Sequence, residues 1–173
     1  MMSPPRPEEN EYAEFYANYV LLVEETDVVS ALRNQPNELQ NLLADVSAEK
    51  EDFRYAVGKW SVKELLGHII DGERVFSYRA LRISRGDETP LAGFEENSYV
   101  ANSNFGNSNL ADLIEEFSLL RASNALLFKN LTKEAWLRTG TASDATVSVR
   151  ALAYIMVGHV RHHTNILRER YLV

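Results

Sequence analysis

Three of the four histidines in this chain lie within five residues, in the stretch GHVRHHTNIL at 158–167. At about 100° per residue around a helix, His163 lies about 40° from His159. Leu152 falls between them on the same face, with Ile155 close by. We therefore expect both imidazoles to point towards a protein core, where a histidine needs a partner for its polar nitrogens.

The fourth histidine, His68, faces the core by the same arithmetic, since it shares a helix face with Leu65 and Phe76. An unpartnered imidazole among apolar side chains buries a polar nitrogen at a cost of a few kcal/mol. Two histidines at i and i+4 can share one ion, and an inward histidine from another helix can join them. This pattern favours a metal site of His68, His159 and His163 over three hydrogen-bonded core histidines.

The ligand types narrow the choice of metal and of chemistry. Three neutral imidazoles suit Zn, Ni, Fe or Cu, and leave coordination positions open for water or substrate. The chain has no cysteine, which excludes thiolate metal sites, disulfides and a cysteine nucleophile. It also lacks the His-Glu-x-x-His motif of zinc proteases and the Glu-x-x-His ligand sets of di-iron bundles. We expect one divalent ion, with Zn or Ni as the leading candidates.

Two charged residues on the helix of His68 are further candidates. Asp71, three residues after His68, could accept the second N–H of a ligand imidazole, or belong to a solvated edge. Arg79 falls about 20° from His68 in helical phase but three turns further on. It could anchor an anionic substrate at one end of a bundle, or be a surface cation. Both alternatives stay open for each residue.

Composition excludes several classes of protein. The chain has 173 residues, 45% of them hydrophobic, which is enough for one sizeable core. A net charge of −7 argues against a nucleic-acid partner, which requires clustered Lys and Arg. The chain has no apolar run of 18 residues, so the sequence predicts no membrane span. Its acidic, Pro-rich start is unlike a secretion signal. We expect a cytoplasmic protein with a flexible segment at 1–10 and a single domain at 11–173.

Apolar residues recur at helical period in four long segments. These segments span about 11–33, 61–85, 110–131 and 149–167. The second has the clearest start, because Ser61 and Glu64 form a capping-box pattern, and Gly86 marks its end. Pro36 predicts an interruption after the first segment, followed by a short helical piece at about 38–46. The pattern predicts an all-α four-helix bundle.

The connection between the second and third helices, residues 87–107, is too long for a tight link. It predicts either a crossover along the bundle or a functional lid. Its aromatic residues Phe94, Tyr99 and Phe105 favour an ordered loop that packs on the bundle.

Three stretches together resemble the DinB/YfiT-like superfamily: GKWSVKELLGH at 58–68, PLAGFEENSYV at 90–100, and the His159-x-x-x-His163 pair. The resemblance covers nearly the whole chain. It implies a left-twisted four-helix bundle with an unusual connection, usually homodimeric, which holds one divalent metal through three histidines. By position these ligands are His68, His159 and His163, whereas His162 is not carried over as a ligand.

The resemblance leaves the reaction open, since some such proteins are thiol S-transferases, one resembles an isomerase, and most have no known reaction. We favour transfer of a low-molecular-weight thiol to an electrophile, in which the metal holds the sulfur as thiolate. The alternatives are a metal-assisted hydrolase and a non-catalytic, stress-related dimeric bundle. Leu66 and Ile70 lie on the far side of the second helix from His68, and they favour a homodimer unless the connection at 87–107 covers them. The sequence does not identify the thiol or the electrophile.

Overall fold

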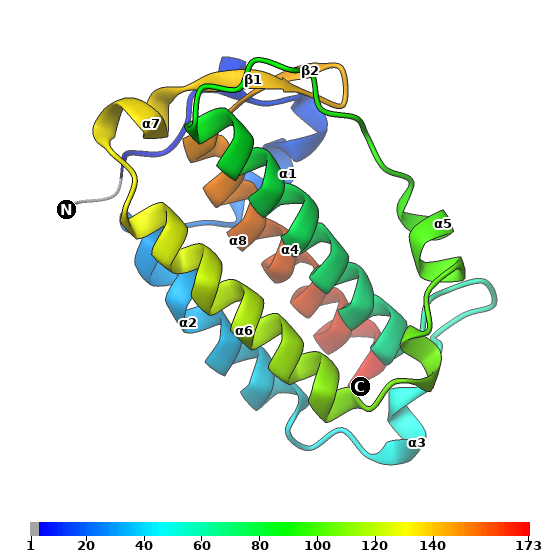
Figure 1. The fold of residues 1–173 in the computed structure, drawn as a ribbon. Coiled ribbons are helices and arrows are strands. Elements are labelled where there is room, and N and C mark those ends of the chain that lie inside the picture. The colour runs from blue at the N-terminus through cyan, green and yellow to red at the C-terminus, as the bar shows by residue number, and fades with distance from the viewer. Residues whose placement is uncertain (1–3) are drawn as a thin grey trace.

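The computed structural model describes residues 4–173, and four helices make up its bundle. The four are α2 (Val28–Leu43), α4 (Val62–Ser84), α6 (Leu110–Lys129) and α8 (Val149–Ile166). Both α4 and α2 pack against α6 and α8, so the first two helices of the bundle lie diagonally opposite each other (Figure 1). The predicted all-α four-helix bundle is confirmed.

The connection between α4 and α6 crosses the length of the bundle. The two helices run in the same direction, and the connection returns along the outside to the end where α4 began (Figure 1). It carries the short helix α5 (Glu96–Ala101) and a 3₁₀ turn at Phe105–Asn107. Phe105 packs so closely on α4 that a Cβ added at Gly67 would lie 2.1 Å from its ring. The connection is therefore ordered, as expected, and of the two alternatives left open by the sequence it forms the crossover.

Local signals place both ends of α4. The Ser61 hydroxyl accepts from the Glu64 amide at 3.2 Å, and the Glu64 carboxylate accepts from the Ser61 amide at 2.7 Å. This reciprocal capping box satisfies two amides that have no partner within the helix. Arg85 ends the helix, and Gly86 follows with φ +79°, a conformation that favours glycine.

The first helix differs from the prediction. In place of one helix over 11–33 there is a short α1 (Ala17–Leu21), and α2 begins after Asp27, whose carboxylate accepts from the amides of Val29 and Ser30. Pro36 lies inside α2 and does not end it. The helix continues past the missing amide because apolar residues on both sides of Pro36 are buried in the bundle. These residues are Val28, Ala31, Leu32, Leu39 and Leu43.

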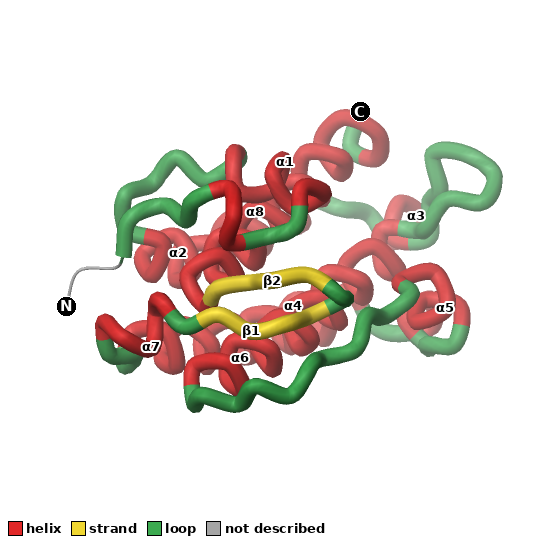
Figure 2. The backbone as a smooth tube through the Cα atoms, turned by 90° about the horizontal axis from the view of Figure 1, so that it is seen from above, coloured by secondary structure: helices red, strands yellow, loops and turns green. Residues whose placement is uncertain are grey.

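A β-hairpin that the sequence pattern did not predict covers one end of the bundle (Figure 2). Its antiparallel strands are β1 (Thr139–Ala142) and β2 (Ala145–Ser148). Both turn residues, Ser143 and Asp144, have positive φ, as a tight two-residue hairpin requires. The crossover is fastened to the hairpin at Leu91, whose amide donates to Thr141 and whose carbonyl accepts from the Ser143 amide.

Short elements complete the described chain. They are 3₁₀ turns at Glu9–Glu11 and Glu14–Tyr16, helices α3 (Ala48–Glu51) and α7 (Lys133–Leu137), and a π-helical turn at Leu167–Tyr171. The predicted flexible segment 1–10 includes residues 1–3, which lie outside the described part. Its flexibility stays a prediction, although the Arg6 guanidinium donates to the Val23 carbonyl. Within residues 4–173, no helix combines the length and apolarity needed to cross a bilayer.

The argument for a dimer from Leu66 and Ile70 is wrong. Both side chains are fully buried within one chain, in a core cluster that includes Leu113 and Phe117 of α6. Since α4 packs against α6 on one side and α8 on the other, its apolar surface extends beyond the face of His68. The homodimer stays a prediction that rests on the family resemblance alone.

Candidate metal centre

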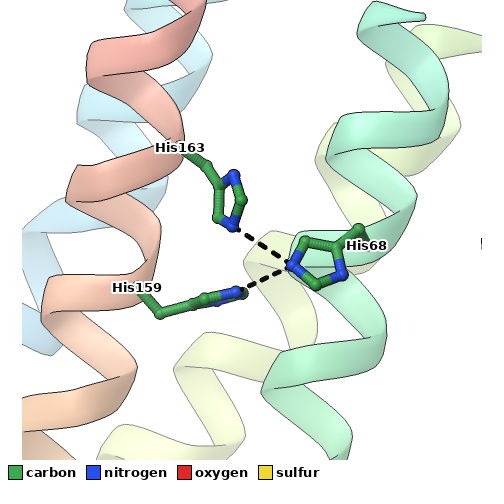
Figure 3. Close-up of side chains that lie close together, drawn as sticks. All are labelled: His68, His159 and His163. Atoms are coloured by element: carbon green, nitrogen blue, oxygen red, sulfur yellow. Dashed lines mark hydrogen bonds between the residues drawn. The ribbon is translucent and has the colours of Figure 1, made fainter. Parts of the chain in front are cut away.

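Three histidines from two helices meet in the interior of the bundle. His68 of α4 faces His159 and His163, which lie one turn apart on α8 (Figure 3). The Nε2 atom of His68 lies 3.0 Å from Nε2 of His159 and 3.1 Å from Nε2 of His163. All three residues are buried, and each offers a ring nitrogen within 4.8 Å of the other two.

The three nitrogens cannot satisfy one another by hydrogen bonds alone. A neutral imidazole nitrogen is either a donor or an acceptor, with one proton or one lone pair, and His68 Nε2 faces two partners. Imidazole nitrogens that bind a tetrahedral zinc at about 2.0–2.1 Å lie roughly 3.3 Å apart. The observed separations are close to that value. The donor set and its geometry therefore fit a divalent metal ion.

Burial keeps these imidazoles neutral. It lowers the pKa of His68 to about 4, with a smaller contribution from the charge of His162. Burial also lowers the pKa of His159 and of His163 well below the usual value, and repulsion from the neighbouring histidines acts in the same direction. At neutral pH each ring thus has an unprotonated nitrogen, which is the form that binds a metal.

Packing holds the rings more than hydrogen bonds do. A Cβ added at Gly72, one turn after His68, would lie 2.8 Å from Cε1 of His159, so this glycine leaves the space that the ring occupies. The Trp60 ring lies 4.7 Å from that of His68, between ring centroids. Nδ1 of His163 is buried without a hydrogen-bond partner in the described structure.

A carboxylate that the sequence analysis did not identify lies beside the histidines. Oε2 of Glu96, on α5, is 3.8 Å from Nε2 of His68. Burial raises the pKa of Glu96, and the neighbouring charge of Glu95 raises it further. The residue could not be found from helical phase, because the crossover rather than a bundle helix carries it. The acidic pair in FEEN at 94–97 was the available signal.

Two cavities reach the histidines, and Glu96 lines both. One has a volume of about 400 Å³ and touches His68 and His159. The other has a volume of about 220 Å³ and touches His163 and Trp60. A small molecule can therefore approach the histidine cluster from either side of Glu96.

The remaining candidate residues lie further from the cluster. His162 is partly exposed and is not one of the three grouped histidines, although its ring centroid lies 4.9 Å from that of His163. The charges that act on Asp71 are those of Arg74 and Glu116, and no hydrogen bond joins it to a histidine in residues 4–173. Its role beside a ligand imidazole stays a prediction.

Arg79 is buried, with 2% of its surface exposed, so it is not a surface cation. Its guanidinium donates to the Ala92 carbonyl, to the Ser143 hydroxyl and to the Tyr16 hydroxyl. These contacts join α4 to the crossover and to the hairpin at the end of the bundle. Whether Arg79 also contacts a substrate stays a prediction at this point.

Comparisons with known proteins identify the family of this chain. A protein from Bacillus licheniformis, named as a candidate metal-dependent hydrolase, is 26% identical over 145 residues, which cover 78% of each chain. The solved structure of YfiT from Bacillus subtilis, described as "a probable metal-dependent hydrolase with an unusual four-helix bundle topology", superposes with a TM-score of 0.76. It is 17% identical and covers 94% of this chain and 89% of its own, a likeness of fold alone. The family model of the DinB superfamily matches residues 31–167, and the chain therefore belongs to that superfamily.

Proposed function

We propose that this protein is a metal-dependent hydrolase in which His68, His159 and His163 hold one divalent ion, Zn or Ni. The observation that carries the proposal is the carboxylate of Glu96 beside three converging imidazole nitrogens. A divalent ion bound there supplies a Lewis acid, which lowers the pKa of water and polarises a substrate oxygen. The names of the similar Bacillus proteins support the same class of reaction.

Glu96 is the proton carrier in this proposal. Its Oε2 atom lies beside the point on which the histidine nitrogens converge, so it is placed to accept a proton from an attacking water. Partial burial raises its pKa above the usual value, and a raised pKa also suits the later return of that proton to a leaving group. The histidines themselves remain neutral and only bind.

Thiol S-transfer is the second candidate. The chain has no cysteine, so any thiol must come from a small molecule, and aromatic side chains in the larger cavity suit an electrophile. A thiol that is acidified by a metal needs no protein base. Glu96 therefore separates the two reactions: hydrolysis should depend strongly on it, and thiol transfer should not.

Two neighbouring glutamates make a matched test. Glu96→Gln should lower the hydrolysis of p-nitrophenyl acetate or alanine p-nitroanilide by roughly 10²–10⁴-fold, with unchanged metal content. Glu95→Gln is the control, because both side chains are exposed but the Glu95 carboxylate accepts from amides at the start of α5, whereas that of Glu96 faces His68. The glutamine oxygen can still accept from those amides. Parallel assays would follow monochlorobimane with glutathione, cysteine, bacillithiol or mycothiol.

The results of these assays distinguish a hydrolase, a thiol S-transferase and a non-catalytic bundle. Thiol-dependent turnover that persists in Glu96→Gln would replace hydrolysis by S-transfer. A metal-loaded wild type that accelerates neither reaction would favour a non-catalytic bundle. Equal losses of hydrolysis in the Glu95 and Glu96 variants would remove Glu96 from its role as base.

A further inference from the structure

The larger cavity extends from the histidines towards the hairpin end of the bundle. His68 and His159 line one end of it, and Tyr16 and Ser143 line it as well. Ser143 lies in the hairpin turn. The cavity walls also carry aromatic rings, which are those of Phe15, Tyr19, Phe76 and Phe94. No part of the proposed hydrolysis uses the hairpin end.

A buried cation lies behind the lining residues at that end. The Arg79 guanidinium donates to the Ser143 hydroxyl at 2.9 Å, to the Tyr16 hydroxyl at 3.4 Å and to the Ala92 carbonyl at 2.8 Å. All three partners are uncharged. Within residues 4–173, no carboxylate lies at ion-pair distance from Arg79, although the residue is only 2% exposed. A buried charge without a counter-ion is costly, and an anion placed nearby would reduce that cost.

The two hydroxyls carry the effect of this charge to the cavity. A hydroxyl has one O–H to donate, and it cannot point that hydrogen at a guanidinium from which its oxygen accepts. In the described structure neither the Tyr16 nor the Ser143 hydroxyl donates to a protein acceptor. Since both residues line the cavity, their free O–H groups are available to a ligand inside it.

We propose that Tyr16, Ser143 and the Arg79 guanidinium behind them form a subsite for a substrate carboxylate. The proposal rests on the proposed function, because the histidine end of the same cavity would hold the scissile bond. Charge-assisted hydrogen bonds of this kind are stronger than neutral ones, and a cation behind both donors strengthens them further. The substrate class is an ester or amide that carries a distant carboxylate.

The fold sets the length and the orientation of such a substrate. Eleven residues separate His68 from Arg79 along α4, a rise of about 16 Å, so with side-chain reach a spacer of roughly six to ten atoms would fit. The aromatic walls between the two ends suit an apolar spacer. Among the described residues that line the cavity, the acidic ones are Glu95 and Glu96, and Glu96 lies beside His68. Asp144, next to Ser143 in the hairpin turn, is exposed and does not line the cavity, so the lining favours a carboxylate at the Arg79 end.

Hydroxamates of graded length test this subsite in Zn²⁺-loaded protein. Monohydroxamates of linear dicarboxylic acids, from succinate to sebacate, would be compared with matched compounds whose far end is a primary amide. In the wild type the acid should bind at least 10-fold more tightly than the amide at one preferred length. Tyr16→Phe and Ser143→Ala should each reduce this ratio several-fold, and Arg79→Met should bring it close to one. Tyr55→Phe, in the other cavity, is the matched control and should leave the ratio unchanged.

The amide-ended compounds separate failure of the subsite from failure of the metal site. If they bind but the acids bind no better at any length, or if the preference survives in Tyr16→Phe/Ser143→Ala, the subsite is wrong. If no hydroxamate binds, the metal site is wrong, and octanoate against octanamide in metal-free protein then decides the subsite. Octanoate should bind more tightly, and it should lose this advantage in Tyr16→Phe/Ser143→Ala. Equal binding would overturn the proposal.

Discussion

Two polar clusters are buried between the helices of this bundle, and they differ in how well their donors and acceptors match. In the first cluster, the Arg121 guanidinium donates to the Glu73 carboxylate, to the Gln35 side chain and to the Met156 carbonyl. Asn124 donates to the other oxygen of Glu73, and Gln35 donates to the Val157 carbonyl. This network joins α2, α4, α6 and α8 with opposite charges in contact. Only Nε of Arg121 lacks a described partner.

The second cluster, of His68, His159 and His163, has no such match. Its three nitrogens face one another, and the Glu96 carboxylate, 3.8 Å from His68, is too far to accept a hydrogen bond. Within residues 4–173, Nδ1 of His163 has no partner. Buried polar groups in native proteins are nearly always paired, and exceptions call for an explanation. The hydrogen bonds and ion pair of the Arg121–Glu73 cluster account for its burial within one chain. The histidine cluster lacks such partners, and a ligand from outside the chain would supply them.

The largest expected effect follows from removing one histidine. His163→Ala should reduce bound divalent metal from about one ion per chain to near zero, because two imidazoles are a poor site. His162→Ala should keep wild-type metal content, since its ring lies outside the cluster. Elemental analysis after gentle purification measures both. Equal losses in the two variants, or a metal-free wild type, would break the contrast between the clusters.

The matched network should respond in the opposite way. Arg121→Met or Glu73→Leu alone should lower the free energy of unfolding by about 3–5 kcal/mol, because each leaves an uncompensated buried charge. The double variant should recover much of this loss. Urea unfolding measures the free energy of unfolding of the two single variants and the double variant. The folded double variant should still bind metal. A double variant that loses metal as His163→Ala does would show that the two clusters are one unit.

Acid should weaken the histidine cluster in metal-free protein. Burial lowers the pKa of the folded histidines, so the unfolded chain binds more protons below about pH 6.5, and stability falls as pH falls towards 4. For His68 alone, the free energy of unfolding at pH 5 should be about 2 kcal/mol lower than at pH 7. Urea unfolding at pH 7 and pH 5 measures the difference, and His68→Phe should reduce it. A slope that is unchanged in this variant would place the proton uptake elsewhere.

The smallest expected effect concerns the space around His159. A methyl group at Gly72 would press on the imidazole, so Gly72→Ala should weaken metal binding by about 10-fold, or about 1.4 kcal/mol. The unfolding free energy of this variant without metal should change little, because the preference of a helix for alanine over glycine, about 1 kcal/mol, offsets the crowding of His159. Competition with a chelator and urea unfolding measure the two quantities. An unchanged affinity would show that the ring moves freely.

The inward direction of the three histidines and the start of α4 could be predicted from the sequence, because each depends on local geometry. Helical period places His159 and His163 on the apolar face of one helix, and the Ser61–Glu64 capping box acts within a single turn. These features need no knowledge of the neighbouring chain. They were enough to name the three residues that the fold brings together.

Tertiary structure alone decided which side chains surround that cluster. The course of the crossover places Glu96 beside His68, and the packing of α6 against α4 buries Leu66 and Ile70. Helix α2 continues past Pro36 because the burial of apolar residues before and after it outweighs one missing hydrogen bond. The buried contacts of Arg79 and Arg121 likewise join segments far apart in the chain, and local period carries no information about such long-range contacts.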